Sequence, residues 1–421
     1  MRVLVGNSRS ALSLPSPPRH RGGEGAVHLI PASLSRLILG QGWATSGTQS
    51  PNLAAKLFFK NNDKRRLKLE ALKAGLPPNC NDYAFTGPLE LLFSVSEPSQ
   101  AIGYVMPYFD GLLPLYAVTR GIRNGIVSTS RALEIARRIC AAFAAAHRVG
   151  IVIGDVNESN LGVTKSGAVV VLDTDSFQVR SREVTFRCAV GRPEYTPPEL
   201  QGVKFSEVDR TSASDAFGLG VILFGLFLNG EHPFAAIYRR AGNAPSIGKR
   251  IKYGLFPHAD GGISDFEPKP STAAFKSLPK AIKELFHDCF EAGHRDRRNR
   301  PSANDWHEAL SKTRDSDLPS AKASRAPRPQ PLVITARPHS HFTSRLFRRE
   351  RRIVLAASGV LLSAGVGISG VLLQHESSPG TDTATRFSSE GGAPTPQAWT
   401  SLKATEPPGG TSYSFTKKAS P

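Results

Sequence analysis

Three carboxylates and one amide lie close together along residues 150–178, whose sequence is GIVIGDVNESNLGVTKSGAVVVLDTDSFQ. A short apolar strand leads to Asp155, and Asn160 follows five residues later. A tight turn then leads into an apolar run that ends at Asp173 and Asp175. The pattern predicts a loop and a hairpin that bring these four side chains together at strand ends.

Oxygen ligands of this kind suit hard divalent cations and the phosphates that such cations carry. One further carboxylate can orient a hydroxyl group that attacks a phosphoryl group. The alternative is a solvated acidic loop without chemistry, and the segment by itself leaves that alternative open.

Three later segments resemble known sequence motifs. They are GRPEYTPPE at residues 191–199, SDAFGLGVILFGLFLNGEHPF at residues 214–234 and RNRPSANDW at residues 298–306. Together with the pattern of Asp155, Asn160 and Asp173, in this order and spacing, they resemble the protein kinase superfamily, in which the first two belong to the catalytic loop. Bacterial proteins that are similar to Ser/Thr kinases share VIGDVN, DxDSFQV and PPELQG with this chain.

The resemblance implies a role for each acidic residue. Asp155 would orient the acceptor hydroxyl, and Asn160 and Asp173 would hold the metal ion. Asp173 lies 13 residues after Asn160, so spacing favours it over Asp175 as the main metal ligand, with Asp175 beside it.

Four further residues are expected to support the fold. Glu199 and Arg300 would form a partly buried ion pair, which costs about 3–5 kcal/mol when one side is removed. Asp215 would begin a buried helix and hold the backbone of the catalytic loop, as its counterpart does in kinases. His147 is expected to cap or pack rather than to catalyse.

The N-terminal part carries a weaker pattern. Lys56 lies in the apolar segment NLAAKLFF and resembles the phosphate-binding lysine of kinases, although an edge-strand lysine is the alternative. Glu70, on the helix predicted to follow, would be its carboxylate partner. Met106, in GYVMPY, would lie near the adenine at the hinge between lobes.

Two segments could form a glycine-rich phosphate loop. The favoured one contains Gly22, Gly23 and Gly25, since glycine allows a phosphate to approach the backbone closely. It requires an insertion around residues 33–50 before Lys56. A glycine pair at residues 40–42, inside that insertion, is the rival loop.

The chain also departs from the kinase pattern. The His-Arg before the catalytic aspartate is Ile153-Gly154, and the lysine two residues after it is Asn157, which we assign to the catalytic group. The threonine that contacts this lysine is replaced by Arg192, which could compensate for Asn157. Because Gly154 replaces the arginine that precedes the catalytic aspartate in kinases, control through a phosphorylated activation segment is doubtful.

Composition limits the other classes of function. The formal net charge is +18, but ten Lys/Arg against three Asp/Glu fall within residues 313–352, next to an apolar run. Such a position suits anionic lipid headgroups better than a nucleic acid, so no nucleic-acid partner is expected. Four cysteines without a CxxC pair indicate neither a zinc site nor a disulfide framework.

The C-terminal part predicts a membrane anchor. Residues 353–373 form an uncharged run of 21 residues, long enough to cross a bilayer, although a buried helix in a soluble domain is the alternative. Basic residues in the linker at 313–352 predict a cytoplasmic N-terminal side. Residues 375–421 are expected to form a disordered extracytoplasmic tail, and residues 1–20 a flexible leader.

We therefore predict an α+β, two-lobed protein-kinase-like fold over residues 21–312 and one C-terminal transmembrane helix. A small β-rich lobe would end near residue 107, and a mainly helical lobe would span residues 108–312. The resemblance implies ATP with Mg²⁺ or Mn²⁺, and Ser/Thr hydroxyls of a protein substrate at a bacterial inner membrane. A pseudokinase is the alternative and a small-molecule phosphotransferase the third possibility; the sequence does not determine the oligomeric state.

Overall fold

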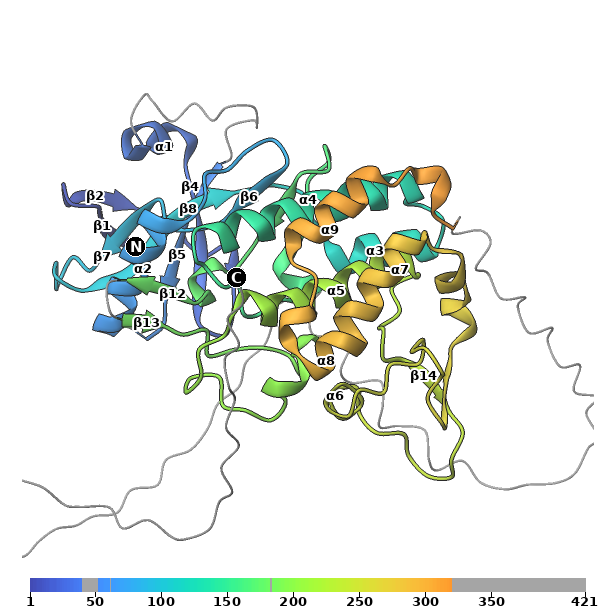
Figure 1. Cartoon of the computed structure of the whole chain (residues 1–421). Helices are drawn as coiled ribbons and strands as arrows, with labels where there is room; N and C mark the ends of the chain where they lie inside the picture. The colour runs from blue at the N-terminus through green and yellow to red at the C-terminus, as the bar shows by residue number, and fades with distance from the viewer. Residues whose placement is uncertain (40–51, 61, 182–183, 320–421) are drawn as a thin grey trace, which may run out of the picture. The chain divides into compact units, whose positions relative to one another are not determined.

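The computed structural model describes residues 1–39, 52–60, 62–181 and 184–319. Within these residues, the strands of the largest sheet form the N-terminal lobe, and helices α3 to α9 form most of the C-terminal lobe (Figure 1). The predicted arrangement of a β-rich part followed by a helical part is confirmed. The sheet ends at Tyr108 and the first helix of the second lobe begins at Leu115, close to the predicted boundary.

The N-terminal sheet has the strand order β2-β1-β7-β8-β5-β4-β3, and all its neighbouring strands are antiparallel. Its seven strands are β1 (Arg2–Val5), β2 (Ser10–Ser13), β3 (His20–Arg21), β4 (Gly25–Ile30), β5 (Asn52–Phe58), β7 (Glu90–Phe93) and β8 (Ala101–Tyr108).

Both faces of this sheet are covered by apolar side chains. Helix α1 (Ala32–Leu39) packs Leu34 and Ile38 against one face, together with residues of the β1–β2 hairpin. Helix α2 (Asp63–Gly75) buries Leu69 against the other face, beside Tyr104. This double coverage explains why β5 and β8 are apolar nearly throughout, with Lys56 as a charged exception on β5.

The structure corrects the prediction of a flexible leader. Within residues 1–20, β1 and β2 form a hairpin, and β1 also pairs with β7 at the edge of the sheet. Val3 is fully buried, and Leu12 and Leu14 are nearly so. Each of these strands is only four residues long, so the hairpin gains its stability from the sheet on which it packs.

The second lobe combines short strands with helices. Its helices are α3 (Leu115–Arg123), α4 (Thr129–Arg148), α5 (Ser212–Phe227), α6 (Ile247–Lys252), α7 (Lys280–His287), α8 (Gly293–Arg295) and α9 (Ala303–Lys312). A four-stranded sheet has the order β6-β11-β10-β9 and lies beside the catalytic loop. Its strands, and those of two small hairpins, are β6 (Tyr83–Phe85), β9 (Leu113–Pro114), β10 (Leu161–Val163), β11 (Val169–Val171), β12 (Val179–Ser181), β13 (Val184–Phe186), β14 (Ala236–Tyr238) and β15 (Phe266–Pro268).

Helix α5 forms the centre of this lobe. It is apolar on all sides and buried over nearly its whole length, as expected of a helix inside a core. Phe224 on α5 packs against Phe256 and Phe286, and Phe286 packs against Trp306 of α9. Helix α5 is therefore held on several sides by packed aromatic side chains.

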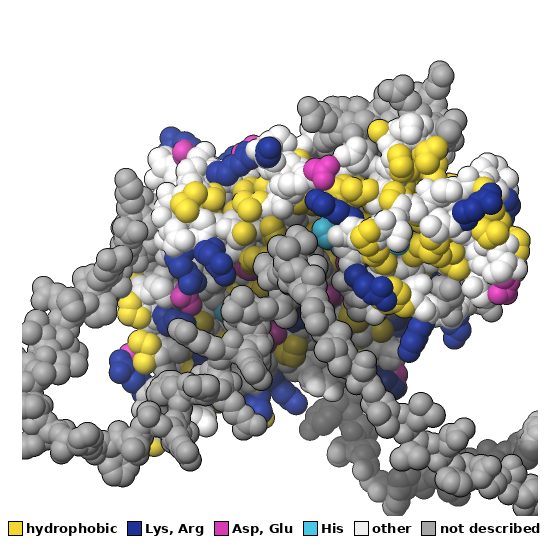
Figure 2. Space-filling model, turned by 180° about the vertical axis from the view of Figure 1, so that it is seen from behind, with side chains coloured by type: hydrophobic (Ala, Val, Ile, Leu, Met, Phe, Trp, Pro, Cys, Tyr) yellow, Lys and Arg dark blue, Asp and Glu magenta, His cyan; other side chains and the backbone are white. Residues whose placement is uncertain are grey.

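On the face shown in Figure 2, Lys and Arg side chains lie in several groups separated by apolar and neutral residues. None of the helices in the described part of the chain is long and apolar enough to cross a membrane. The predicted span at residues 353–373, the predicted tail and most of the predicted linker lie outside the described residues.

Candidate active site

The loop that carries Asp155 is held in place by Asp215 of helix α5. The Asp215 carboxylate accepts hydrogen bonds from the backbone N–H groups of Ile153, at 2.7 Å, and Gly154, at 2.8 Å. His147, near the end of α4, contacts the same carboxylate at 3.0 Å. The predicted supporting role of Asp215 is confirmed, and His147 packs against it, as expected.

Asp155 and Asn160 meet as the sequence spacing predicts. The Asn160 amide donates to the Asp155 carboxylate oxygen Oδ2 and to the Asp155 backbone carbonyl, both at 3.0 Å. The second carboxylate oxygen, Oδ1, is buried and has no hydrogen-bond partner among the described residues. A buried acceptor without a donor is costly, so this oxygen is suited to receive a donor from a bound molecule.

Asn157 has a different place from the one predicted. Its side chain is almost fully buried, its amide donates to the Asp155 carbonyl, and its oxygen accepts from the Ser159 N–H. The Asn157 side chain therefore stabilises the backbone of the loop, and its assignment to the catalytic group is corrected. The expected compensation by Arg192 is not seen either, because Arg192 donates to the Ser159 hydroxyl at 3.3 Å.

Lys56 lies between the two carboxylates that follow β11. Its ammonium group is 2.6 Å from an Asp173 oxygen and 2.5 Å from an Asp175 oxygen. Asp173 has a left-handed backbone with φ of 55°, and its side chain is 46% exposed, whereas that of Asp175 is 9% exposed. The structure therefore brings Lys56, Asp173 and Asp175 together across 117 or more residues of sequence.

Burial and charge act in opposite directions at this cluster. Burial lowers the pKa of Lys56, but the charges of Asp175 and Asp173 outweigh this effect and the pKa is raised. Burial raises the pKa of Asp175, but the charge of Lys56 and the hydrogen bonds from Lys56 and Tyr104 outweigh it, so that pKa is lowered. Both groups are therefore charged at neutral pH.

The predicted partnership of Lys56 with Glu70 is wrong. Glu70 is bonded to Arg66 of its own helix at 3.0 Å, and both side chains are about half exposed. An α-helix turns by about 100° per residue, so Glu70 lies about 160° around the helix from Leu72. Turning Glu70 inward would expose Leu69 and Leu72, each worth about 1.5–3 kcal/mol when buried.

The favoured glycine segment forms the turn of the hairpin between β3 and β4, and its role as a phosphate loop stays a prediction. The hairpin between β3 and β4 turns at Gly22 and Gly23, and Gly22 N donates to the Gly25 carbonyl at 2.9 Å. A side chain at Gly25 would meet the Leu57 carbonyl at 2.3 Å, so this position requires glycine. On the same strand, β4, Val27 pairs with Lys56 of the neighbouring strand β5. The rival loop at residues 40–42 lies outside the described residues.

Met106 lies on β8, opposite Ala54 of β5 in the antiparallel register. It is partly buried and packs against the apolar cluster around Tyr104. It lies near the end of the strand that leads to the second lobe, and its predicted place beside the adenine stays a prediction.

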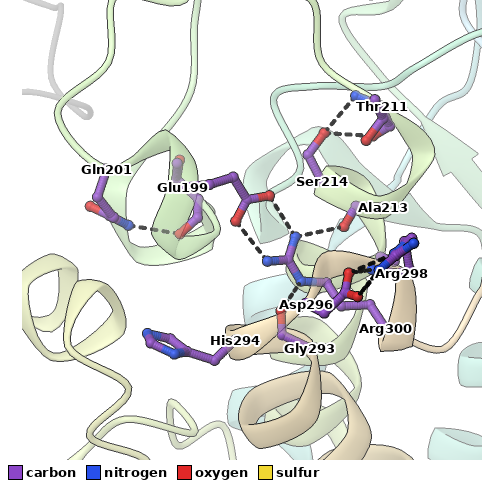
Figure 3. Close-up of polar contacts among 12 residues, drawn as sticks. Glu199, Gln201, Thr211, Ala213, Ser214, Gly293, His294, Asp296, Arg298 and Arg300 are labelled. Carbon is purple, nitrogen blue, oxygen red and sulfur yellow. Dashed lines mark hydrogen bonds and ion pairs between the residues drawn. The ribbon is translucent and has the colours of Figure 1, made fainter. Parts of the chain in front are cut away.

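The ion pair between Glu199 and Arg300 is confirmed (Figure 3). The Arg300 guanidinium donates to both Glu199 carboxylate oxygens, at 2.7 and 2.6 Å, and also to the carbonyls of Gly293 and Ala213. Burial raises the pKa of Glu199, but the hydrogen bonds and charge of Arg300 outweigh it and the pKa is lowered. This pair ties the segment after the catalytic loop to the last helices of the lobe.

Sequence analysis missed two residues of the site. Tyr104 of β8 lies opposite Lys56 in the sheet and donates its hydroxyl to Asp175 at 2.7 Å. Lys68 of α2 donates to the Ser176 carbonyl at 3.1 Å. The pairing of two largely apolar strands, with Lys56 and Tyr104 as polar side chains in their middle, was the available signal for Tyr104.

Residues 91–311 match the protein kinase domain family, just over half of the chain. The protein kinase YegI of Escherichia coli (strain K12) is 31% identical over 224 residues, which cover 51% of this chain and 34% of that protein. The serine/threonine-protein kinase PknB of Mycolicibacterium smegmatis is 33% identical over 134 residues, covering 31% of this chain and 20% of that protein. The chain thus spans about a third or less of the length of these curated relatives. With the site geometry above, the match shows that the chain belongs to the protein kinase domain family.

Proposed function

We propose that the chain is a serine/threonine protein kinase that transfers the γ-phosphoryl group of ATP to protein hydroxyl groups. The observation that carries this proposal is the Asp155 carboxylate, which keeps one buried oxygen without a partner among the described residues. That oxygen suits the hydroxyl proton of an acceptor serine or threonine. The names of the relatives, which include Ser/Thr protein kinases, support the substrate class.

The donor set fits a hard divalent cation such as Mg²⁺ or Mn²⁺. Asp173 offers a half-exposed carboxylate. Asn160 uses its NH₂ group for Asp155, which leaves its amide oxygen for a cation. Oxygen donors of these two kinds are typical magnesium ligands beside substrate phosphates. A bound cation would neutralise charge on the phosphates during transfer.

The remaining residues act on ATP and the acceptor. Lys56 would bind the phosphates, the turn at Gly22 and Gly23 would cover them, and Met106 would lie near the adenine. The acceptor oxygen forms a bond to the γ-phosphorus as the bond to the β-phosphate oxygen breaks, and ADP leaves. Asp155 accepts the hydroxyl proton, so charge and atoms balance.

The test is phosphoryl transfer by the full-length chain. Radiolabelled ATP is supplied with Mg²⁺ or Mn²⁺ and casein, and the labelled amino acids are identified after hydrolysis. Label on serine and threonine is expected in wild type, and none above background in Asp155→Ala. Label on tyrosine only, or equal label in Asp155→Ala, would overturn the proposal.

One observation favours the alternative of a pseudokinase. The position two residues after the catalytic aspartate, a lysine in the kinases that the chain resembles, is Asn157, which is buried inside the loop. In that case the chain would bind ATP and transfer nothing. Nucleotide binding without any label on casein or on the chain itself would support this alternative.

We also propose that the kinase domain is held at the inner face of a bacterial cytoplasmic membrane. The support is the uncharged run at residues 353–373, with five arginines at residues 345–352 before it. Basic residues favour the cytoplasmic side of a span, where ATP is available. Protein substrates near the membrane would then be preferred.

A further inference from the structure

Two carboxylates from the segment after β11 contact the Lys56 ammonium, and that of Asp175 is far more buried than that of Asp173. The Asp175 oxygen that accepts from Lys56 also accepts from the Tyr104 hydroxyl, at 2.5 and 2.7 Å. Tyr104 is fully buried, and the side chains of Lys56 and Asp175 are 13% and 9% exposed. Two donors from neighbouring strands thus hold one carboxylate oxygen in a nearly dry position, where charged hydrogen bonds are strong.

Helix α2 offers Lys56 no carboxylate in the described structure. Its glutamate, Glu70, faces away and bonds to Arg66. On the inward side the helix presents a second cation, Lys68, which reaches the Ser176 carbonyl next to Asp175. A helix that supplied the acidic partner would carry a glutamate on its inward side. Helix α2 instead carries Lys68 on that side, and Glu70 bonds to Arg66 elsewhere on the helix.

We propose that Asp175 is the positioning residue for Lys56, and that it takes the place of a carboxylate on helix α2. The inference rests on the proposed function, because positioning matters only if Lys56 binds nucleotide phosphates. The proposal gives the two aspartates different roles. Asp173 is left to hold the cation, and Asp175 orients the lysine together with Tyr104.

The proposal also has a consequence for regulation. In this arrangement the partner of Lys56 belongs to the same short segment as the metal ligand Asp173, two residues away. When that segment becomes ordered, Lys56 and the metal ligand Asp173 are positioned together. Helix α2 contributes through Lys68, so it need not swing inward for Lys56 to be aligned.

A double-mutant cycle in the full-length chain tests the proposal. The dissociation constant for ATP is measured by calorimetry for wild type, Lys56→Met, Asp175→Asn and the double variant, with the melting temperature of each as a check on folding. Because Asn keeps the shape but loses the charge, Asp175→Asn should weaken binding by about tenfold or more. The double variant should bind no more than about twofold weaker than Lys56→Met, since Asp175 acts through the lysine.

Tyr104→Phe gives a second, milder variant in case Asp175→Asn folds poorly. It removes one hydroxyl and should weaken ATP binding in wild type but not in the Lys56→Met background. Multiplied effects in both double variants would overturn the proposal. So would wild-type binding in Asp175→Asn.

Two further measurements separate the rival explanations. If Asp175 is a metal ligand, raising the Mg²⁺ concentration should restore binding in Asp175→Asn, because the asparagine keeps one oxygen for the cation; we expect no such rescue. If α2 rotates and Glu70 is the true partner, Glu70→Gln should weaken binding as strongly as Asp175→Asn; we expect a change below about twofold. A wild-type chain that binds ATP but labels no substrate would reject the proposed function and leave the binding cycle interpretable.

Discussion

The ion pair between Glu199 and Arg300 allows a quantitative prediction. The Arg300 side chain is 1% exposed and that of Glu199 is 33% exposed. In Glu199→Ala the guanidinium keeps its bonds to the carbonyls of Gly293 and Ala213 but loses its counter-charge. A buried cation without an anion is the costly outcome of breaking such a pair.

The magnitude follows from general values. Removing one partner of a buried pair costs about 3–5 kcal/mol, and the partial exposure of Glu199 places this case near 3. A folded domain of about 300 residues has an unfolding entropy of about 0.6 kcal/mol/K near its midpoint. The melting temperature of Glu199→Ala should therefore fall by about 5 °C.

The assay is thermal unfolding by circular dichroism at pH 7, and Figure 3 contains the matched control. Arg298 pairs with Asp296 nearby, but its side chain is 86% exposed, so Arg298→Ala should change the melting temperature by no more than about 1–2 °C. Glu199→Ala combined with Arg300→Met should lose less than the sum of the single changes. Equal shifts for Glu199→Ala and Arg298→Ala would refute the reasoning.

Three more predictions concern the metal, the pH and the membrane. Asp173→Ala should bind ATP with the same affinity with and without Mg²⁺ in calorimetry. If Mg²⁺ still increases the affinity of this variant for ATP, the cation is held by other residues. Burial lowers the pKa of His232 to about 4, and its ring bonds the Glu194 carbonyl. Its value in the unfolded chain is about 6.5, so its stabilising contribution is present above that pH and is lost as pH falls towards 4, by at most about 3 kcal/mol. Urea unfolding of His232→Gln should show a smaller loss between pH 7 and 4.5, and an unchanged loss would contradict this. The full-length chain should sediment with membranes and resist carbonate, whereas deletion of residues 353–373 should release it; sedimentation of both would exclude this run as the anchor.

Local spacing explains why the catalytic loop could be predicted. Asp155 and Asn160 are five residues apart, so the loop that joins them also brings them together. Glu199 and Arg300 are 101 residues apart, and their pairing was expected only from the resemblance. In both cases the structure agrees with the prediction.

Long-range packing explains what could not be predicted. The hairpin at residues 2–13 has little apolar periodicity, and it becomes ordered because β1 adds to the free edge of β7. Which side of α2 faces the sheet is decided by the packing of Leu69. The residue type of Glu70 suggested a partner for Lys56, but Glu70 bonds to Arg66 instead. Neither the pairing of β1 with β7 nor the orientation of α2 can be read from the spacing of neighbouring residues.

The most direct test of the account compares wild type with Asp155→Asn at saturating Mg²⁺ and ATP. The account predicts that the rate of phosphoryl transfer to a protein substrate falls by about 10²–10⁴-fold, because the base that accepts the hydroxyl proton is gone. The dissociation constant for ATP and the melting temperature should stay close to wild type, because Asp155 contacts neither Lys56 nor the supporting carboxylate of Asp215 in the described hydrogen bonds. Equal transfer rates in the two proteins, or no transfer by wild type, would contradict the claim that this site is a working kinase centre.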